Sequence, residues 1–295
     1  MTPITEVEGR RLSLTNLEKV LYPRSGFTKA EVLHYYATVA EPLLAQLDDR
    51  PVSFLRFPDG PEGQRFFAKN VPPGTPDWVR TAEVPHSDGP ARQVLVSDLA
   101  SLMWAANLVP EFHTPQWRAG AYGVADRLVF DLDPGAPATV VECCRVALWL
   151  RERLAEDGLE AHPKTSGSKG LHLLVALEPV ASSQVTAYAR RLAVAAGRAF
   201  PELVTHLMKR SLRTGRVFVD FSQNAAAKTT ATPYTLRAQP EPTVSAPVTW
   251  DEVAACRDPA HLVVTAAEVP DRLHEHGDLL APLLAEERAG TLPEG

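Results

Sequence analysis

Apolar residues recur along this chain in short β-prone runs and in longer helical spacings. The short runs predict strands at 52–57, 92–96, 127–132, 171–177 and 217–221, with another near 160–164. Three capping boxes, each a threonine followed three residues later by a glutamate, predict helices that begin after Thr28, Thr139 and Thr249.

The first predicted helix carries apolar side chains from Val32 to Leu47, and the second runs to about Asp157 before Gly158 ends it. The third is shorter. Residues 182–199 predict a fourth helix, whose exposed side includes Arg190, Arg191 and Arg198.

Strands and helices alternate through the middle of the chain, which predicts an α/β or α+β fold. The short step from 160–164 to 171–177 across Ser166–Gly170 predicts a hairpin. We therefore expect mixed or antiparallel central sheets flanked by helices, rather than a doubly wound parallel sheet. Polar motifs at the strand ends would then share one sheet and face a common cleft.

Composition narrows the class of protein. The chain has 295 residues, 45% of them apolar, which is ample for a buried core. There is no run of 18 apolar residues and no secretory pattern at the N-terminus. The cysteines, Cys143, Cys144 and Cys256, form no Cys-x-x-Cys pair, so we expect neither a disulfide framework nor a zinc knuckle. A cytoplasmic protein without membrane contact is the expectation.

The net charge of −6 conceals an uneven distribution. Residues 251–295 hold ten acidic and three basic residues, a local −7, so the remainder is +1. Residues 205–240 carry six basic residues and one acid, Asp220. A basic stretch around one carboxylate suits a phosphate-rich ligand, although a solvated basic face is the alternative.

Three carboxylates lie at the ends of apolar runs. Asp131 and Asp133 are two residues apart, so on a strand they point to the same face. Asp220, from another strand, can complete a cage for two divalent ions roughly 4 Å apart. The alternatives are exposed carboxylates before an Asp-Pro-Gly turn, and an ion pair between Asp220 and a nearby arginine.

A basic, glycine-rich segment precedes His172, and it lacks the spacing of a Walker A loop. Ser166, Lys169 and backbone N–H groups in this turn can hold a triphosphate. The alternative, which is more common for such a turn, is that it only reverses the chain.

The default interpretation of His113 is a histidine in a polar cluster. Phe66 and Phe67 read as core aromatics, but an aromatic pair between basic residues also stacks bases.

Taken together, the motifs resemble the polymerase domain of bacterial DNA ligase D, a member of the archaeo-eukaryotic primase superfamily. The resemblance covers about residues 10 to 290, with its motifs in family order. They are Leu14–Pro23, Arg65–Lys69, Phe112–His113, Phe130–Pro134, Thr165–His172, Asp220–Asn224, Lys228–Thr230 and Pro233–Arg237.

The resemblance implies a primase-polymerase fold around an active-site cleft, in a single catalytic domain spanning 1–295. About 10–60 would form the part with a 5′-phosphate pocket, about 60–250 the catalytic core, and 250–295 an acidic helical segment. The implied activity is DNA-directed primase-polymerase activity that extends primers and fills short gaps at DNA ends in non-homologous end joining. Ribonucleotides would be preferred, with Mn²⁺ or Mg²⁺ as a pair of ions.

The same resemblance assigns roles by position. Asp131, Asp133 and Asp220 would be the catalytic metal ligands. The nucleoside triphosphate would contact His113, Ser166, Lys169, His172, Arg213, Gln223, Arg237 and Phe67. DNA would contact Asn16, Lys19, Lys29, Phe66 and Lys228, with Asn16, Lys19 and Lys29 gripping a 5′-phosphate. Residues 86–100 would form a surface loop that bridges two DNA ends.

The implied partners are DNA ends or gaps with a 5′-phosphate, nucleoside triphosphates, the end-binding protein Ku and an ATP-dependent DNA ligase. On DNA the protein would be nucleoid-associated. A DNA-end-bridging module with vestigial polymerase activity is the alternative function. A metal-dependent nuclease is a third, but it gives no reason for a triphosphate loop beside an aromatic pair.

Overall fold

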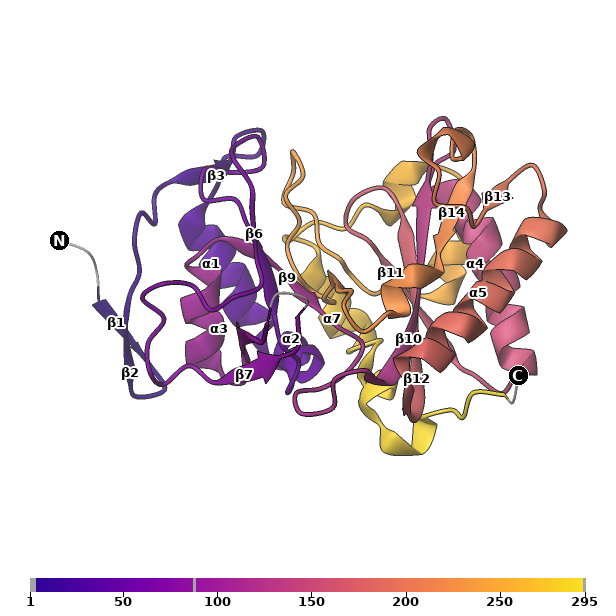
Figure 1. Ribbon diagram of the computed structural model, residues 1–295. Coiled ribbons are helices and arrows are strands. Elements are labelled where there is room, and N and C mark those ends of the chain that lie inside the picture. The colour runs from indigo at the N-terminus through magenta and orange to yellow at the C-terminus, as the bar shows by residue number, and fades with distance from the viewer. Residues whose placement is uncertain (1–3, 87–88, 294–295) are drawn as a thin grey trace. The chain divides into compact units, whose positions relative to one another are not determined.

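The computed structural model describes residues 4–86 and 89–293 (Figure 1). The chain separates into two compact units, each assembled from three segments. The first unit comprises Met1–Thr114, Ala231–Val244 and Thr265–Gly277, and the second comprises Pro115–Thr230, Ser245–Val264 and Asp278–Gly295. That the whole chain acts as one catalytic domain, with parts divided near 60 and 250, stays a prediction.

The first unit is built from small antiparallel sheets and helices. β1 (Ile4–Val7) pairs with β2 (Arg10–Ser13), β3 (Val20–Tyr22) with β4 (Phe27–Thr28), and β7 (Thr81–Val84) with β8 (Ala91–Val94). A further sheet has the order β15-β9-β5-β6, formed by β15 (Thr230–Ala231), β9 (Pro110–Thr114), β5 (Ser53–Arg56) and β6 (Phe66–Ala68).

The helices of this unit are α1 (Lys29–Thr38), α2 (Ala40–Leu47), α3 (Leu99–Ala106) and α7 (Val269–His276). The capping box at Thr28 and Glu31 is confirmed. The expectation of one helix reaching Leu47 is wrong, because the helix is interrupted at Val39. Pro42 explains the interruption, since a proline inside a helix lacks an N–H group and clashes with the carbonyl four residues earlier.

Tyrosines from the N-terminal segment anchor the distant 231–244 segment in the first unit. The Tyr35 hydroxyl donates to the carbonyl of Tyr234 over 2.8 Å, and the Tyr36 hydroxyl accepts from the Leu236 amide over 3.1 Å. Tyr22 donates to the Arg237 carbonyl. These buried hydroxyls satisfy backbone groups that the irregular segment leaves without a sheet partner.

The second unit contains the predicted sheet of strand-end motifs. Its order is β11-β12-β10-β14-β13, with only the β13–β14 pair parallel. The strands are β11 (Ala161–Thr165), β12 (Leu171–Ala181), β10 (Val124–Pro134), β14 (Val217–Asp220) and β13 (Val204–Thr205). The expected mixed sheet and the β11–β12 hairpin are confirmed.

One face of this sheet is covered by α4 (Val140–Glu156) and α5 (Ser182–Ala199), which pack against β10 and against each other (Figure 1). Leu128, Phe130 and Leu132 are fully buried. Val129, which alternation places on the opposite face, packs with Leu280 and its neighbours. Asp131 and Asp133 continue the Val129 face, so the two carboxylates lie on this face at the end of β10.

The remaining helical pieces are short. They are α6 (Trp250–Ala255), η1 (Arg210–Leu212), η2 (Phe221–Asn224), η3 (Pro259–Leu262), η4 (Ala281–Leu284) and η5 (Glu286–Arg288). The capping boxes predicted at Thr139 and Thr249 both form. Among the described residues, no helix is both long and apolar enough to span a bilayer.

The expected bridging loop at 86–100 is narrower than predicted. Residues Ala91–Val94 are strand β8, and helix α3 already begins at Leu99. Residues 87–88 lie outside the described part of the chain. Because β8 pairs with β7 inside this range, the range is not one surface loop.

Candidate active site and nucleic-acid interface

The three predicted carboxylates come together on the sheet of the second unit. Asp131 and Asp220 are direct cross-strand partners in the β10–β14 register. Directly opposed residues of antiparallel strands have side chains on the same face, with Cβ atoms roughly 5 Å apart. Asp133 lies two residues further along β10 and therefore shares that face. The prediction that three strand-end motifs meet on one sheet is confirmed.

A row of polar side chains crosses the sheet at this level. Lys164 on β11 pairs with His172 on β12, His172 pairs with Asp131, and Asp131 pairs with Asp220. The Nε2 atom of His172 lies 3.3 Å from Oδ1 of Asp131. Lys164 is fully buried and donates to the Ser245 hydroxyl, which in turn donates to the carbonyl of Thr165. Each member of the row is therefore held from at least one side.

Basic side chains surround Asp133. The Lys169 Nζ atom lies 3.0 Å from Asp133 Oδ1, and an Arg213 guanidinium nitrogen lies 3.9 Å from Asp133 Oδ2. The Arg213 guanidinium also stacks on the Phe218 ring at 3.6 Å from its centroid, which fixes its orientation. With 62% of its side chain exposed, Lys169 can exchange Asp133 for another anion.

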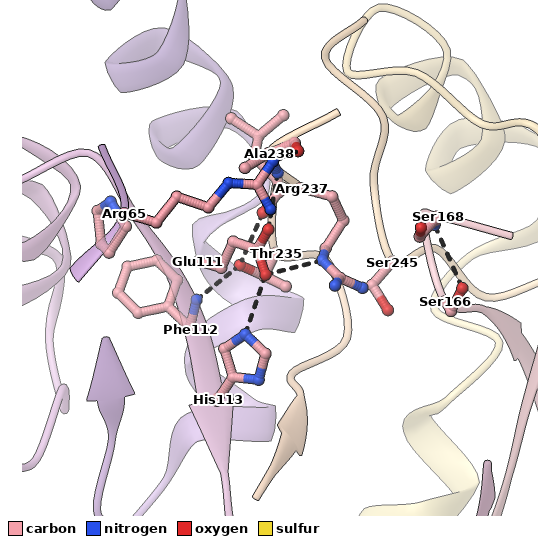
Figure 2. Close-up of polar contacts among 12 residues, drawn as sticks. Arg65, Glu111, Phe112, His113, Ser166, Ser168, Thr235, Arg237, Ala238 and Ser245 are labelled. Atoms are coloured by element: carbon pink, nitrogen blue, oxygen red, sulfur yellow. Dashed lines mark hydrogen bonds and ion pairs between the residues drawn. The ribbon is translucent and has the colours of Figure 1, made fainter. Parts of the chain in front are cut away.

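The glycine-rich loop lies tightly against β10. A Cβ atom at Gly170 would come within 2.2 Å of the Leu132 carbonyl oxygen, and one at Gly135 within 2.0 Å of the Arg213 carbonyl oxygen. Only glycine permits these approaches. The Ser166 hydroxyl accepts from the amide of Ser168 over 3.2 Å (Figure 2) and from the amide of Gly170 over 3.0 Å. This side chain therefore shapes the loop.

Asp220 is held by its own downstream turn. Its Oδ1 atom accepts from the Ser222 amide at 3.0 Å and from the Ser222 hydroxyl at 2.6 Å, and Oδ2 accepts from Gln223 Nε2 at 3.0 Å. The buried Asn224 side chain exchanges two 2.8 Å hydrogen bonds with the backbone of Val129. Asn224 thereby ties η2 to β10 and fixes Asp220 beside Asp131.

The donor set suits divalent cations, because three carboxylates share a face and oxygen ligands suit Mn²⁺ and Mg²⁺. Within residues 4–86 and 89–293, no three acidic, histidine or cysteine side chains form a ready metal-ligand cluster. The carboxylates instead contact Lys169, His172 and Gln223. Metal binding therefore requires the Lys169–Asp133 ion pair to open, because a bound cation would take the place of that ammonium group.

The first unit gathers another set of predicted residues on its β-sheet. Phe67 and Glu111 both align with Leu55 across β6, β5 and β9, and His113 lies two residues beyond Glu111. These side chains consequently share one face. The rings of Phe67 and His113 are 6.4 Å apart in an edge-to-face arrangement. Phe66 and Phe67 are 45% and 55% exposed, so the default reading as core aromatics is wrong.

A separate basic group in the first unit contains Asn16, Lys19 and Lys29. The Lys19 amide donates to the Asn16 carbonyl, and the Lys29 amide donates to the Lys19 carbonyl, so the three lie close together. Lys19 pairs with Asp59 at 2.6 Å. Lys29 is 5% exposed and its Nζ donates to Thr15 over 3.2 Å. Burial, followed by the charge of Lys19, lowers the pKa of Lys29 from 10.5 to about 8.

Lys228 stands apart from these groups. It is exposed on the loop after η2, where its amide donates to the Ala225 carbonyl.

The sequence did not predict Glu111, Asn224 and Lys164 as parts of the site. Glu111 and Asn224 lie beside His113 and Gln223 in motifs already singled out, but a single buried polar residue carries no pattern that identifies its partners.

Comparison with known proteins places this geometry in a family. The model of the LigD primase-polymerase domain matches residues 28–280. The multifunctional non-homologous end joining protein LigD of Mycolicibacterium smegmatis is 45% identical over 280 residues, which cover 94% of this chain and 36% of that protein. The bifunctional LigD of Bacillus subtilis is 32% identical over 270 residues, covering 90% of this chain and 43% of that protein. The chain therefore spans less than half the length of these relatives.

A solved structure gives the same result. The polymerase domain of Mycobacterium tuberculosis ligase D in complex with DNA is 43% identical and superposes with a TM-score of 0.89. The match covers 94% of this chain and 99% of that one. The family model, the curated relatives and the solved domain agree, and this chain belongs to the LigD primase-polymerase family.

Proposed function

We propose that this chain is a DNA-directed primase-polymerase that extends primers and fills short gaps at broken DNA ends in non-homologous end joining. The observation that carries the proposal is the placement of Asp131, Asp133 and Asp220 on one face of a sheet, with Lys169 and Arg213 beside them. Paired carboxylates flanked by mobile and fixed cations suit transfer of a nucleotidyl group from a triphosphate.

Asp131, Asp133 and Asp220 would hold two Mn²⁺ or Mg²⁺ ions. When bound, these ions would lower the pKa of the primer 3′-hydroxyl and neutralise charge on the pyrophosphate leaving group. Lys169, freed from Asp133, would neutralise the triphosphate, and Arg213 would add a cation whose orientation Phe218 fixes. His172 and Gln223 orient Asp131 and Asp220 respectively.

The exposed ring of Phe67 provides a stacking surface for a base, and His113 lies at its edge. Phe66 is the preceding strand residue and points to the opposite face, so the two rings serve different bases. We propose the incoming base for Phe67 and the template for Phe66. Lys228 and the basic stretch around Asp220 would follow the DNA backbone.

The 5′-phosphate on the downstream side of a gap would bind at Asn16, Lys19 and Lys29. Lys29 occupies the first turn of α1, where backbone N–H groups and the helix dipole favour an anion. A phosphate there would favour the protonated state of Lys29 and offset the effect of burial and of Lys19 on its pKa. Ku and an ATP-dependent DNA ligase are the proposed protein partners at the DNA end.

Ribonucleotide preference requires a contact to the 2′-hydroxyl, which we place near Ser166. Its hydroxyl is fixed by two loop amides and is therefore a rigid group for such a contact. Replacing Ser166 with alanine should lower the ratio of ribonucleotide to deoxynucleotide insertion. An unchanged ratio would reject this placement.

Primer extension on a one-nucleotide gap tests the function. The reaction compares Mn²⁺ with chelator, ribo- with deoxynucleotides, and a 5′-phosphate with a 5′-hydroxyl. Asp131→Ala should abolish extension, whereas Asp126→Asn, which removes a β10 carboxylate paired with Arg118, should retain it. Absence of extension by the wild-type protein, with phosphate-dependent DNA binding retained, would favour a DNA-end-binding module instead.

A further inference from the structure

Glu111 is a buried carboxylate at the centre of the first unit's polar contacts. It lies on β9 and is 1% exposed. Figure 2 shows His113, Arg237 and the backbone of Ala238 converging on it. Its Oε2 atom accepts from His113 Nε2 and Arg237 Nε, each over 3.0 Å, and its Oε1 atom accepts from the Ala238 amide over 2.7 Å.

The carboxylate stays ionised despite its burial. Burial by itself raises the pKa of Glu111, but the His113 hydrogen bond, the Arg237 charge and the Ala238 amide together lower it to about 2. An ionised carboxylate only accepts hydrogen bonds, so the proton on the His113–Glu111 contact belongs to Nε2 of His113. Glu111 therefore determines both the ring orientation of His113 and which of its nitrogens carries that proton.

Glu111 connects segments that are distant in sequence. His113 follows it on β9, whereas Arg237 and Ala238 belong to the segment that Tyr22, Tyr35 and Tyr36 anchor. Arg65, just before β6, donates to the carbonyl of Ala238 over 3.2 Å. The carboxylate thus lies where β9, the approach to β6 and the 231–244 segment meet, on the same face of the sheet as Phe67.

We propose that Glu111 is a positioning residue for the incoming nucleotide, which it does not itself touch. It holds the imidazole of His113 and the guanidinium of Arg237 in a fixed relation, so that both receive the triphosphate without further ordering. This inference rests on the proposed function, in which His113 and Arg237 contact the nucleotide. Preorganised donors bind more tightly because their side-chain entropy is already lost on folding.

Glu111→Gln keeps the shape of the side chain but removes its charge. It also turns an NH₂ group either toward His113 and Arg237 or toward the Ala238 amide. We expect the KM for the nucleotide to rise on the order of 10- to 100-fold, with a smaller change in kcat. Asp98→Asn is the matched control. Asp98 caps α3, pairs with Arg10 and lies outside the nucleotide contacts, so its variant should lose thermal stability without a change in KM.

A double-mutant cycle separates positioning from general destabilisation. If Glu111 acts through Arg237, then Glu111→Gln should raise KM far less in an Arg237→Ala background than in the wild type. Additive effects, a wild-type KM for Glu111→Gln, or an equal KM increase in the Asp98→Asn control would overturn the proposal. Equilibrium binding of ATP with Mn²⁺ is measured in parallel. Absence of primer extension would count against the polymerase function. The effect of Glu111→Gln on nucleotide affinity would still be measured from ATP binding.

Discussion

Replacing Lys29 with methionine should raise stability and weaken phosphate binding at the same time. Lys29 is 5% exposed, and among the described residues no carboxylate pairs with it, since Asp59 contacts Lys19 instead. Burial and the charge of Lys19 lower its pKa from 10.5 to about 8. Because one pKa unit corresponds to about 1.4 kcal/mol, keeping Lys29 charged costs the folded state on the order of 3 kcal/mol at neutral pH.

The pH dependence has a definite sign. Below pH 8 the lysine is protonated in both the folded and the unfolded chain, so the full cost is present. Between pH 8 and 10.5 the unfolded chain binds more protons, and the stability of the wild type rises with pH. Lys29→Met, which keeps an apolar stem, should therefore raise the free energy of unfolding below pH 8, and the gain should disappear by about pH 10.5.

The same variant should lose affinity for a gapped duplex with a 5′-phosphate by about 10- to 100-fold and leave the 5′-hydroxyl duplex little affected. Fluorescence anisotropy at fixed ionic strength measures both affinities, and urea denaturation measures the stability. Lys209→Met, at an exposed lysine of the basic stretch around Asp220, is the control. It should lower the affinity for both duplexes alike and change neither the stability nor the preference for the 5′-phosphate. A destabilised Lys29→Met protein that still prefers the 5′-phosphate would refute the reasoning.

Three further predictions concern the frame of the site. Gly170→Ala places a Cβ atom within 2.2 Å of the Leu132 carbonyl, so primer extension should fall at least tenfold, as kinetics on the purified variant would show. Thr139→Ala removes the capping hydroxyl of α4 and should lower the free energy of unfolding by about 1 kcal/mol in urea, with KM unchanged. Because the pKa of Glu111 is lowered to about 2, its contribution to stability should be complete above about pH 4.5 and decline from there toward pH 2. The free energy of unfolding is measured across this pH range for wild type and Glu111→Gln, and parallel curves throughout would contradict the prediction.

Much of the second unit could be predicted from the sequence, because its signals are local. The capping boxes, the apolar runs and the hairpin across Ser166–Gly170 each identify their own element. The carboxylates required one additional step, namely that alternation along β10 puts Asp131 and Asp133 on one face. Pairing with β14 then places Asp220 opposite Asp131.

The first unit was harder to predict because its order depends on contacts between distant segments. Strand β9 reads Pro-Glu-Phe-His-Thr, which has little β character, and it forms a strand through pairing with β5. Helix α3 is buried almost all round and so has no amphipathic pattern. Two partners of Glu111, Arg237 and Ala238, are more than 120 residues away, and no local signal connects them to it.

The three-segment composition of the first unit has a consequence for biosynthesis. During translation, β9 leaves the ribosome long before Arg237 and Ala238. Glu111 therefore lacks its contacts to these two residues while the entire second-unit segment 115–230 is synthesised. The hydrogen bonds of Tyr35 to Tyr234 and of Tyr36 to Leu236 cannot form until that later segment has been synthesised. The N-terminal 114 residues alone are thus a poor choice for expression, and the first unit can complete its fold only after residue 277 has emerged.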